Sequence, residues 1–193
     1  NDLFGKGLPE YDGALPQRVQ DVEKAKFLLK KAGRSDLKIT LYSAKAAPGM
    51  LESATAFAAQ AQAAGVTISV NNGPADTYFS DKYLKVNFGQ SQWASEPIST
   101  WVEQSLITGA PYNETHWHRT AFEDLFIRAR GELDPVKRKA LMFELQKQLW
   151  DEGGYLIWGF YPLIDGLARN VRGAVPNPAQ PLSNLNFRDF WLA

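Results

Sequence analysis

Cysteine is absent from the 193 residues, and histidine occurs only twice. The lack of cysteine excludes disulfide scaffolds, cysteine-based zinc sites and thiol catalysis. Lysine and arginine together number 21, as do aspartate and glutamate, so no net charge attracts the chain to nucleic acid or to an anionic membrane. No apolar run approaches the ~20 residues of a membrane-spanning helix. The balance of charges leads us to expect no nucleic-acid partner.

The composition is that of a globular protein. Hydrophobic residues make up 45% of the chain and aromatic residues 12%, which is enough for a buried core. The first residues, NDLFGKGLPEYDG, resemble neither a signal peptide nor a translation start. We expect the chain to begin inside a longer protein.

Helix and strand signals alternate in the first half, after an irregular lead-in at residues 1–20. The strand, helix, strand order predicts a βαβ unit with a right-handed crossover and a turn at residues 71–74. The predicted elements are a helix from the cap Asp21 to Gly33, a strand at 37–43, a helix at 50–64, a strand at 66–70, a short helix at 75–83 and a third strand at 84–89.

The second half begins with two predicted helices. One covers residues 121–130, and the other starts at Asp134 and Pro135 with leucines on one stripe. The apolar run YLIWGFY, residues 155–161, predicts a buried strand, whereas residues 162–193 are rich in loops. Core positions are predicted for the aromatic residues Tyr78, Trp101, Trp158, Phe160 and Tyr161.

The segment at residues 88–118 has the composition of a binding site. It holds three of the six tryptophans and both histidines, and Pro97, Gly109 and Pro111 break it into short pieces. Ligands of open α/β sheets bind beyond the carboxyl ends of the strands, so Trp93 is well placed for ligand contact.

Two other functions fit parts of this segment. His116 and His118, with Glu114, provide nitrogen and oxygen ligands for the metal of a hydrolase, although a nucleophile and a complete ligand set are not recognisable. An exposed tryptophan platform built on Trp93 is typical of a carbohydrate-binding module.

The order of signals resembles the carboxy-terminal part of the extracellular solute-binding proteins of peptide-type ABC importers. The likeness is carried by DVEKAKFLLKKAG, LKITLYS, AAGVTISV, a Trp-containing loop, YNETHWH, the long run AFEDLFIRARGELDPVKRKALMFELQKQLWDEGG and a terminal FRDFWL. It extends through essentially the whole chain.

This resemblance implies an α/β lobe of the type II periplasmic-binding-protein fold, with a mixed sheet flanked by helices on both faces. Residues 1–161 would form the carboxy-terminal lobe, and residues 162–193 would return toward a hinge and an amino-terminal lobe outside this chain. The receptor would be exported, periplasmic or lipid-anchored, with a membrane permease as its partner. It would need no cofactor and catalyse no reaction.

An oligopeptide or dipeptide is the ligand that the resemblance implies first, with nickel complexes and oligosaccharides as alternatives. Self-association of the isolated lobe is also expected, because its partner face would be uncovered.

The resemblance also assigns site residues. Trp93 and Glu96 match a tryptophan and an acid three positions later that pairs with the α-ammonium group of the ligand. Pro97 follows earlier than the family's proline, which predicts a shortened loop. The segment with Asn113, His116 and Trp117 would shape the floor of the cleft, and Tyr161 would border it.

Overall fold

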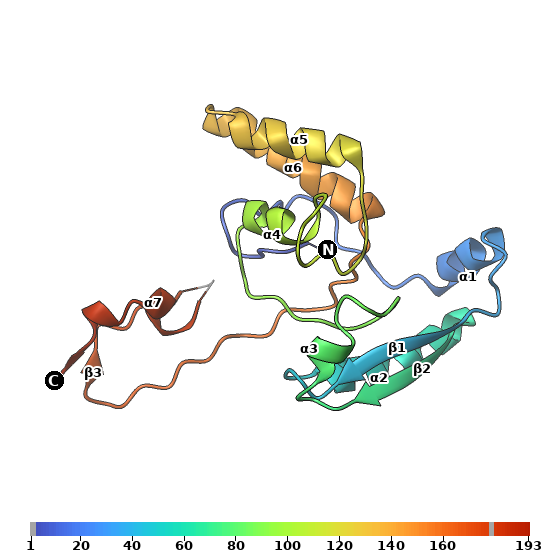
Figure 1. Cartoon of the computed structure of the whole chain (residues 1–193), viewed down its shortest axis with the longest axis horizontal. Helices are drawn as coiled ribbons and strands as arrows, with labels where there is room; N and C mark the ends of the chain where they lie inside the picture. Colours follow the sequence, from blue (N-terminus) through green and yellow to red (C-terminus); the bar gives the residue numbers. More distant parts are fainter. Residues whose placement is uncertain (1–2, 178–179) are drawn as a thin grey trace. The chain divides into compact units, whose positions relative to one another are not determined.

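The computed structural model describes residues 3–177 and 180–193. The chain forms two compact units (Figure 1). Unit 1 comprises Asn1–Gln17 and Ala94–Ala193, and unit 2 comprises Arg18–Trp93. Helices and strands alternate in unit 2, whereas helices dominate unit 1. The chain is therefore an α/β protein, as predicted.

Unit 2 is built around a βαβ arrangement. Strands β1 (Lys38–Ala44) and β2 (Thr67–Gly73) pair in parallel, with Lys38 opposite Thr67 and Ala44 opposite Gly73. The connection runs through helix α2 (Met50–Ala61) and the short helix η1 (Gln62–Ala64), and α2 lies along both strands (Figure 1). This confirms the predicted parallel pair. The turn predicted at residues 71–74 is wrong in part, because β2 continues through Gly73.

Helix α1 (Val22–Lys31) precedes the strands. Its start is fixed by Asp21, whose carboxylate accepts a hydrogen bond of 2.8 Å from the Lys24 amide, as the sequence predicts. The apolar side chains of this helix are poorly buried: Phe27 is 64% exposed and Leu28 is 49% exposed. An N-cap is a local interaction, whereas the burial of a helix face depends on a partner.

The predicted third strand at residues 84–89 forms only at its end. The Tyr42 amide donates to the Phe88 carbonyl, and the Gln90 amide donates to the Tyr42 carbonyl, each at 3.0 Å. Before this point the backbone turns, because Leu84 has a left-handed φ of 61° that interrupts an extended strand. The chain thus leaves the sheet edge shortly before Trp93.

Tyr78 of helix α3 (Tyr78–Asp81) fastens this pairing. Its hydroxyl lies 2.9 Å from the Tyr42 carbonyl oxygen and 2.8 Å from the Gln90 carbonyl oxygen, so that its hydrogen is shared between the two. The ring is buried with Ala44 and Met50 in the core of unit 2, which confirms the predicted core position.

Unit 1 contains helices α4 (Ile98–Ser105), α5 (Thr120–Gly131) and α6 (Pro135–Glu152). Helices α5 and α6 lie side by side (Figure 1). The Asp134 carboxylate caps α6 by accepting from the Val136 and Lys137 amides at 2.8 and 3.1 Å. The buried apolar side chains of unit 1 are Leu3, Ile98, Trp101, Val102, Leu106, Trp117, Phe122, Leu125, Phe126, Ala129, Met142, Leu145 and Leu149.

The end of the chain adds short elements. Strands β3 (Val171–Arg172) and β4 (Trp191–Leu192) pair antiparallel, and between them lie α7 (Pro181–Leu185) and η2 (Phe187–Asp189). Among residues 3–177 and 180–193, no helix combines the length and the apolar character that crossing a bilayer requires.

Gln146 joins the lead-in to helix α6. Its side chain is fully buried, its amide donates to the Glu10 carbonyl at 2.7 Å and to the Met142 carbonyl at 3.1 Å, and its oxygen accepts from the Asp12 amide at 2.8 Å. Burial of Tyr11, with the Asp12 carboxylate nearby, raises the pKa of the Tyr11 phenol. The lead-in is irregular, as predicted, yet firmly attached.

The buried strand predicted at residues 155–161 is wrong. This segment has no regular secondary structure, and Trp158 is 68% exposed, with Phe160 and Tyr161 also exposed. Apolar β-forming residues become a buried strand only where neighbouring strands supply hydrogen bonds and a packing surface. In the described part of unit 1 no strand pairs with this segment, whereas its first residue, Tyr155, packs edge-on to Phe4 and Trp101 with ring centroids 5.2 and 5.1 Å apart.

Replacing Gln146 by leucine should lower the free energy of unfolding by about 2–5 kcal/mol. The apolar side chain would leave the Asp12 amide and the Glu10 carbonyl unpaired in the interior. Urea unfolding measures this change. Lys147→Ala, on the exposed neighbouring position, is the control and should change stability by less than about 0.5 kcal/mol. Equal stability of the two variants would contradict the role of Gln146.

Replacing Tyr78 by phenylalanine should loosen the edge where residues 88–90 meet β1. Losing a shared hydrogen bond of about 1–2 kcal/mol predicts hydrogen exchange about 5- to 30-fold faster at the Tyr42 and Gln90 amides. Tyr112→Phe, in unit 1, removes a hydroxyl from a half-exposed ring and serves as the control. Unchanged exchange at both amides would show that the Tyr78 hydroxyl does not hold this edge.

Candidate functional site

The candidate residues lie in two places, one in each unit. In unit 2, β1, β2 and residues 88–90 run in parallel, so their carboxyl ends lie at the same edge of the sheet. The chain continues from this edge to Trp93, which is half-buried. In unit 1, Glu96 immediately precedes Pro97, the N-cap of α4.

A network of neutral polar groups supports the edge in unit 2. The hydroxyl of the buried Ser43 donates to the Gln90 side-chain oxygen at 2.6 Å, and the Gln90 amide donates to the Ser53 hydroxyl at 2.9 Å. Ser53 in turn donates to the Met50 carbonyl at 2.9 Å. The network ties the chain leading to Trp93 to β1 and to the first turn of α2.

Glu96 carries an unsatisfied buried atom. Among the described residues, its Oε2 oxygen is shielded from solvent and has no hydrogen-bond partner. Buried polar atoms in folded proteins are nearly always hydrogen-bonded, and a lone carboxylate oxygen costs more than a neutral group. This oxygen is therefore available to a cationic or hydrogen-bond-donating ligand.

The backbone around Glu96 is held by the lead-in. A Cβ atom at Gly5 would lie 2.9 Å from the Glu96 carbonyl oxygen, so the two backbones are in direct contact. Glu10 accepts from the Ser99 amide at 3.1 Å, near the start of α4, and Phe4 stacks on Trp101 with ring centroids 3.5 Å apart. Sequence reasoning missed Gly5 and Glu10, because a glycine and an acid in an irregular segment give no signal of their distant partners.

The segment from Asn113 to Trp117 is stabilised by its own side chains. The Asn113 amide donates to the Trp117 carbonyl at 2.9 Å, and the Thr115 hydroxyl donates to the Asn113 side-chain oxygen at 3.2 Å. Trp117 is buried with its ring edge-on to Phe122 at 4.9 Å, while its Nε1 atom has no partner among the described residues. His116 is exposed and has a left-handed φ of 53°. The segment is thus a self-supported turn.

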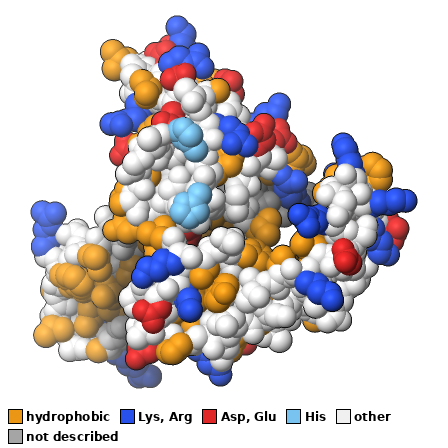
Figure 2. All heavy atoms as spheres, turned by 45° about the vertical axis from the view of Figure 1, so that its right-hand side comes forward, with side chains coloured by type: hydrophobic (Ala, Val, Ile, Leu, Met, Phe, Trp, Pro, Cys, Tyr) orange, Lys and Arg blue, Asp and Glu red, His pale blue; other side chains and the backbone are white. Residues whose placement is uncertain are grey.

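The two histidines do not form a metal site with Glu114. No group of three His, Cys, Asp or Glu side chains suited to a metal exists within residues 3–177 and 180–193. His118 Nδ1 instead lies 2.7 Å from the Glu123 carboxylate and 3.1 Å from the Thr108 hydroxyl. Figure 2 shows both histidines, in pale blue, at the surface.

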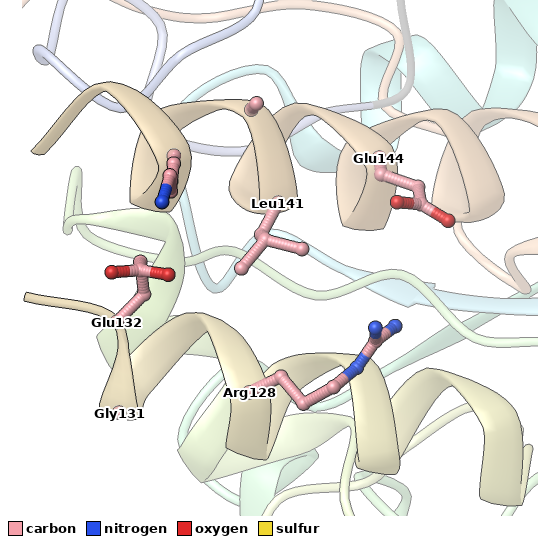
Figure 3. A pocket seen from close by; sticks show the side chains of 7 residues that line it. Arg128, Gly131, Glu132, Leu141 and Glu144 are labelled. Carbon is pink, nitrogen blue, oxygen red and sulfur yellow. The ribbon is translucent and has the colours of Figure 1, made fainter. Parts of the chain in front are cut away.

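Two open grooves lie away from these residues. One, of about 590 Å³, separates α5 from α6, where Arg128 and Leu141 extend into it from the two helices (Figure 3). Its remaining lining residues are Gly131, Glu132, Lys137, Ala140 and Glu144. The other, of about 540 Å³, runs beside β1 and is lined by Ile39, Thr40, Tyr42, Lys85, Val86, Asn87 and Phe88. No predicted site residue lines either groove.

Comparison with known proteins identifies the family of the chain. Residues 1–110 match the model of the bacterial extracellular solute-binding proteins, family 5, middle region. Di/tripeptide-binding protein 4 of Pseudomonas aeruginosa is 27% identical over 188 residues. That match covers 92% of this chain but 34% of the relative, so the chain spans about a third of the relative's length.

Solved structures share the fold. CtaP from Listeria monocytogenes, an ABC transporter substrate-binding protein, matches with a TM-score of 0.72 and 19% identity over 95% of this chain and 39% of its own. HbpA2 from Haemophilus parasuis gives 0.71 and 19% identity over 95% and 38%. DppA from Helicobacter pylori, a periplasmic binding protein solved with the peptide STSA, gives 0.69 and 18% over 95% and 37%. The chain therefore belongs to family 5 of the bacterial extracellular solute-binding proteins and has their periplasmic-binding-protein-like α/β fold.

Proposed function

We propose that this chain is a ligand-binding lobe of a receptor that captures a small peptide and delivers it to a membrane permease. Family membership supports the transport role, and the similar proteins from Pseudomonas and Helicobacter are named for di- and tripeptides or solved with a peptide. The observation that carries the proposal is the buried carboxylate oxygen of Glu96, which has no hydrogen-bond partner in the described part of the chain.

Glu96 is the proposed partner of the ligand's α-ammonium group. An ammonium group offers three N–H donors and a positive charge, and its hydrogen bond to a shielded carboxylate is stronger than one between neutral groups. Such a contact would satisfy the Oε2 oxygen and compensate its desolvation. A neutral ligand without a donor would leave that oxygen unpaired.

Trp93 is the proposed contact for an apolar part of the ligand. It stands three positions before Glu96 and follows directly from the edge supported by Gln90. A tryptophan offers a large apolar ring together with one N–H donor, which suits variable side chains. Asn113, His116 and Trp117 shape the cleft floor in this proposal, with the Trp117 N–H as an additional donor, and the exposed Tyr161 borders the cleft.

The remainder of the receptor is proposed to form a second lobe. Residues 162–193 return toward it, and the exposed apolar side chains of the segment at 156–164 pack against it. These are Leu156, Trp158, Phe160, Tyr161, Leu163 and Ile164. The receptor is exported, as a periplasmic or lipid-anchored protein, and binds its ligand without catalysing a reaction. Without the second lobe, this surface promotes self-association.

In the full-length protein, Glu96→Gln should weaken binding of di- and tripeptides by about 10- to 100-fold, because the charge-assisted hydrogen bond is lost. Trp93→Ala should weaken it to a similar extent by removing the ring. Isothermal titration measures both changes. Glu144→Gln, the same substitution on the exposed face of α6, is the matched control and should leave affinity unchanged.

Native mass spectrometry of the unrefolded protein tests the ligand class independently. A co-purified oligosaccharide or nickel complex, with unchanged affinity in Glu96→Gln, would contradict peptide recognition by Glu96. One bound metal ion per chain, lost in His116→Ala, would instead support the metal-dependent hydrolase.

The 193-residue chain alone should bind these peptides with a Kd of about 1 mM or weaker. One lobe provides part of the contacts and little desolvation, while the entropic cost of association is nearly unchanged. Titration monitored by nuclear magnetic resonance covers this range of affinity. Micromolar binding by the chain alone would show that it contains the complete site.

A further inference from the structure

We infer that Gly5 is a positioning residue for the Glu96 carboxylate, so that the lead-in at residues 3–12 sets the specificity for a cationic ligand group. This inference rests on the proposed function, because it concerns the same carboxylate. Gly5 and Glu96 are distant in the sequence but belong to the same compact unit.

The contact at Gly5 admits no side chain. Gly5 is buried and has a left-handed φ of +73°, and a Cβ atom there would lie 2.9 Å from the Glu96 carbonyl oxygen and 3.8 Å from the Ile98 amide nitrogen. The obstructing atom is backbone, so relief requires the Glu96 peptide to move. Glycine is the residue that allows both this conformation and this approach.

Further contacts fix the chain on both sides of Gly5 and beyond Glu96. Phe4 stacks on the buried Trp101 of α4 at 3.5 Å. The Glu10 carboxylate accepts from the Ser99 amide at 3.1 Å and from the Ser99 hydroxyl at 3.1 and 3.3 Å. The Glu10 carbonyl in turn accepts from the buried Gln146. The backbone from Glu96 to Ser99 is therefore held by the lead-in.

The lead-in holds the Glu96 backbone without neutralising its carboxylate. Lys6 is the sole basic residue among positions 3–12, and its ammonium nitrogen lies over the Phe160 ring, 5.7 Å from the centroid. A carboxylate with a fixed backbone and an unpaired buried oxygen is preorganised for a donor from outside the chain. Moving the backbone would misalign that oxygen.

The test is a double-mutant cycle in the full-length protein, titrated with a free-amine tripeptide. Gly5→Ala should weaken binding about 10-fold when Glu96 is present and less than about 2-fold in the Glu96→Gln background, because residues that act through one another are non-additive. Gly7→Ala is the matched control: Gly7 also has a left-handed φ, +88°, but a Cβ there meets nothing within 4 Å. It imposes similar backbone strain without displacing Glu96 and should leave affinity unchanged.

Thermal unfolding identifies any variant that fails to fold. In that case Glu10→Ala provides a second route, since it releases Ser99 without changing Gly5, and its effect should also disappear in the Glu96→Gln background. An equal loss of affinity from Gly5→Ala in both backgrounds would overturn the positioning role while leaving the proposed function intact. Equal peptide affinity of the native and Glu96→Gln proteins, or no peptide binding by either, would refute the proposed role of Glu96 and this inference together.

Discussion

The buried amide of Gln146 is the interaction on which unit 1 depends. It offers a donor and an acceptor in the interior, and both are satisfied by the backbone of the lead-in, at Glu10 and Asp12. This fixes the lead-in along α6 and brings the Glu10 carboxylate to Ser99 and Gly5 to Glu96. The environment of the proposed ligand carboxylate thus follows from a residue that has no role in binding.

In unit 2, Tyr78 has a role similar to that of Gln146. Its hydroxyl joins two carbonyl groups, at Tyr42 and Gln90, where a short stretch of chain meets β1. The Gln90 side chain then bonds to Ser43 and Ser53. In both units, one buried polar side chain orders an irregular segment by completing backbone hydrogen bonds. In unit 2 that segment leads to Trp93, and in unit 1 it contacts the Glu96 backbone. Regular secondary structure provides the frame, whereas side-chain hydrogen bonds position the site.

Parts of the site could be predicted from the sequence, and parts could not. The cluster of aromatic residues and the position of Glu96 after Trp93 are visible in the letters. The role of Gly5 is not, because a glycine in an irregular stretch has the same pattern whether it lies against solvent or against another backbone. The metal site considered for His116 and His118 does not form for a related reason. Spacing in the sequence does not determine where side chains point, and His118 pairs with Glu123 instead.

The sequence by itself determined the elements whose causes are local. Asp21 and Asp134 begin helices, Gly65 ends the α2 and η1 run in a left-handed conformation, and the spacing of β-forming segments around a helix gives a parallel pair. Only the tertiary structure decided which apolar runs are buried and which polar atoms are paired. Residues 155–161 have the pattern of a core strand, yet Trp158, Phe160 and Tyr161 lie exposed. The Glu96 oxygen is buried, yet it has no partner among the residues that the structure describes. Both outcomes depend on contacts between residues far apart in the chain, which no local pattern encodes.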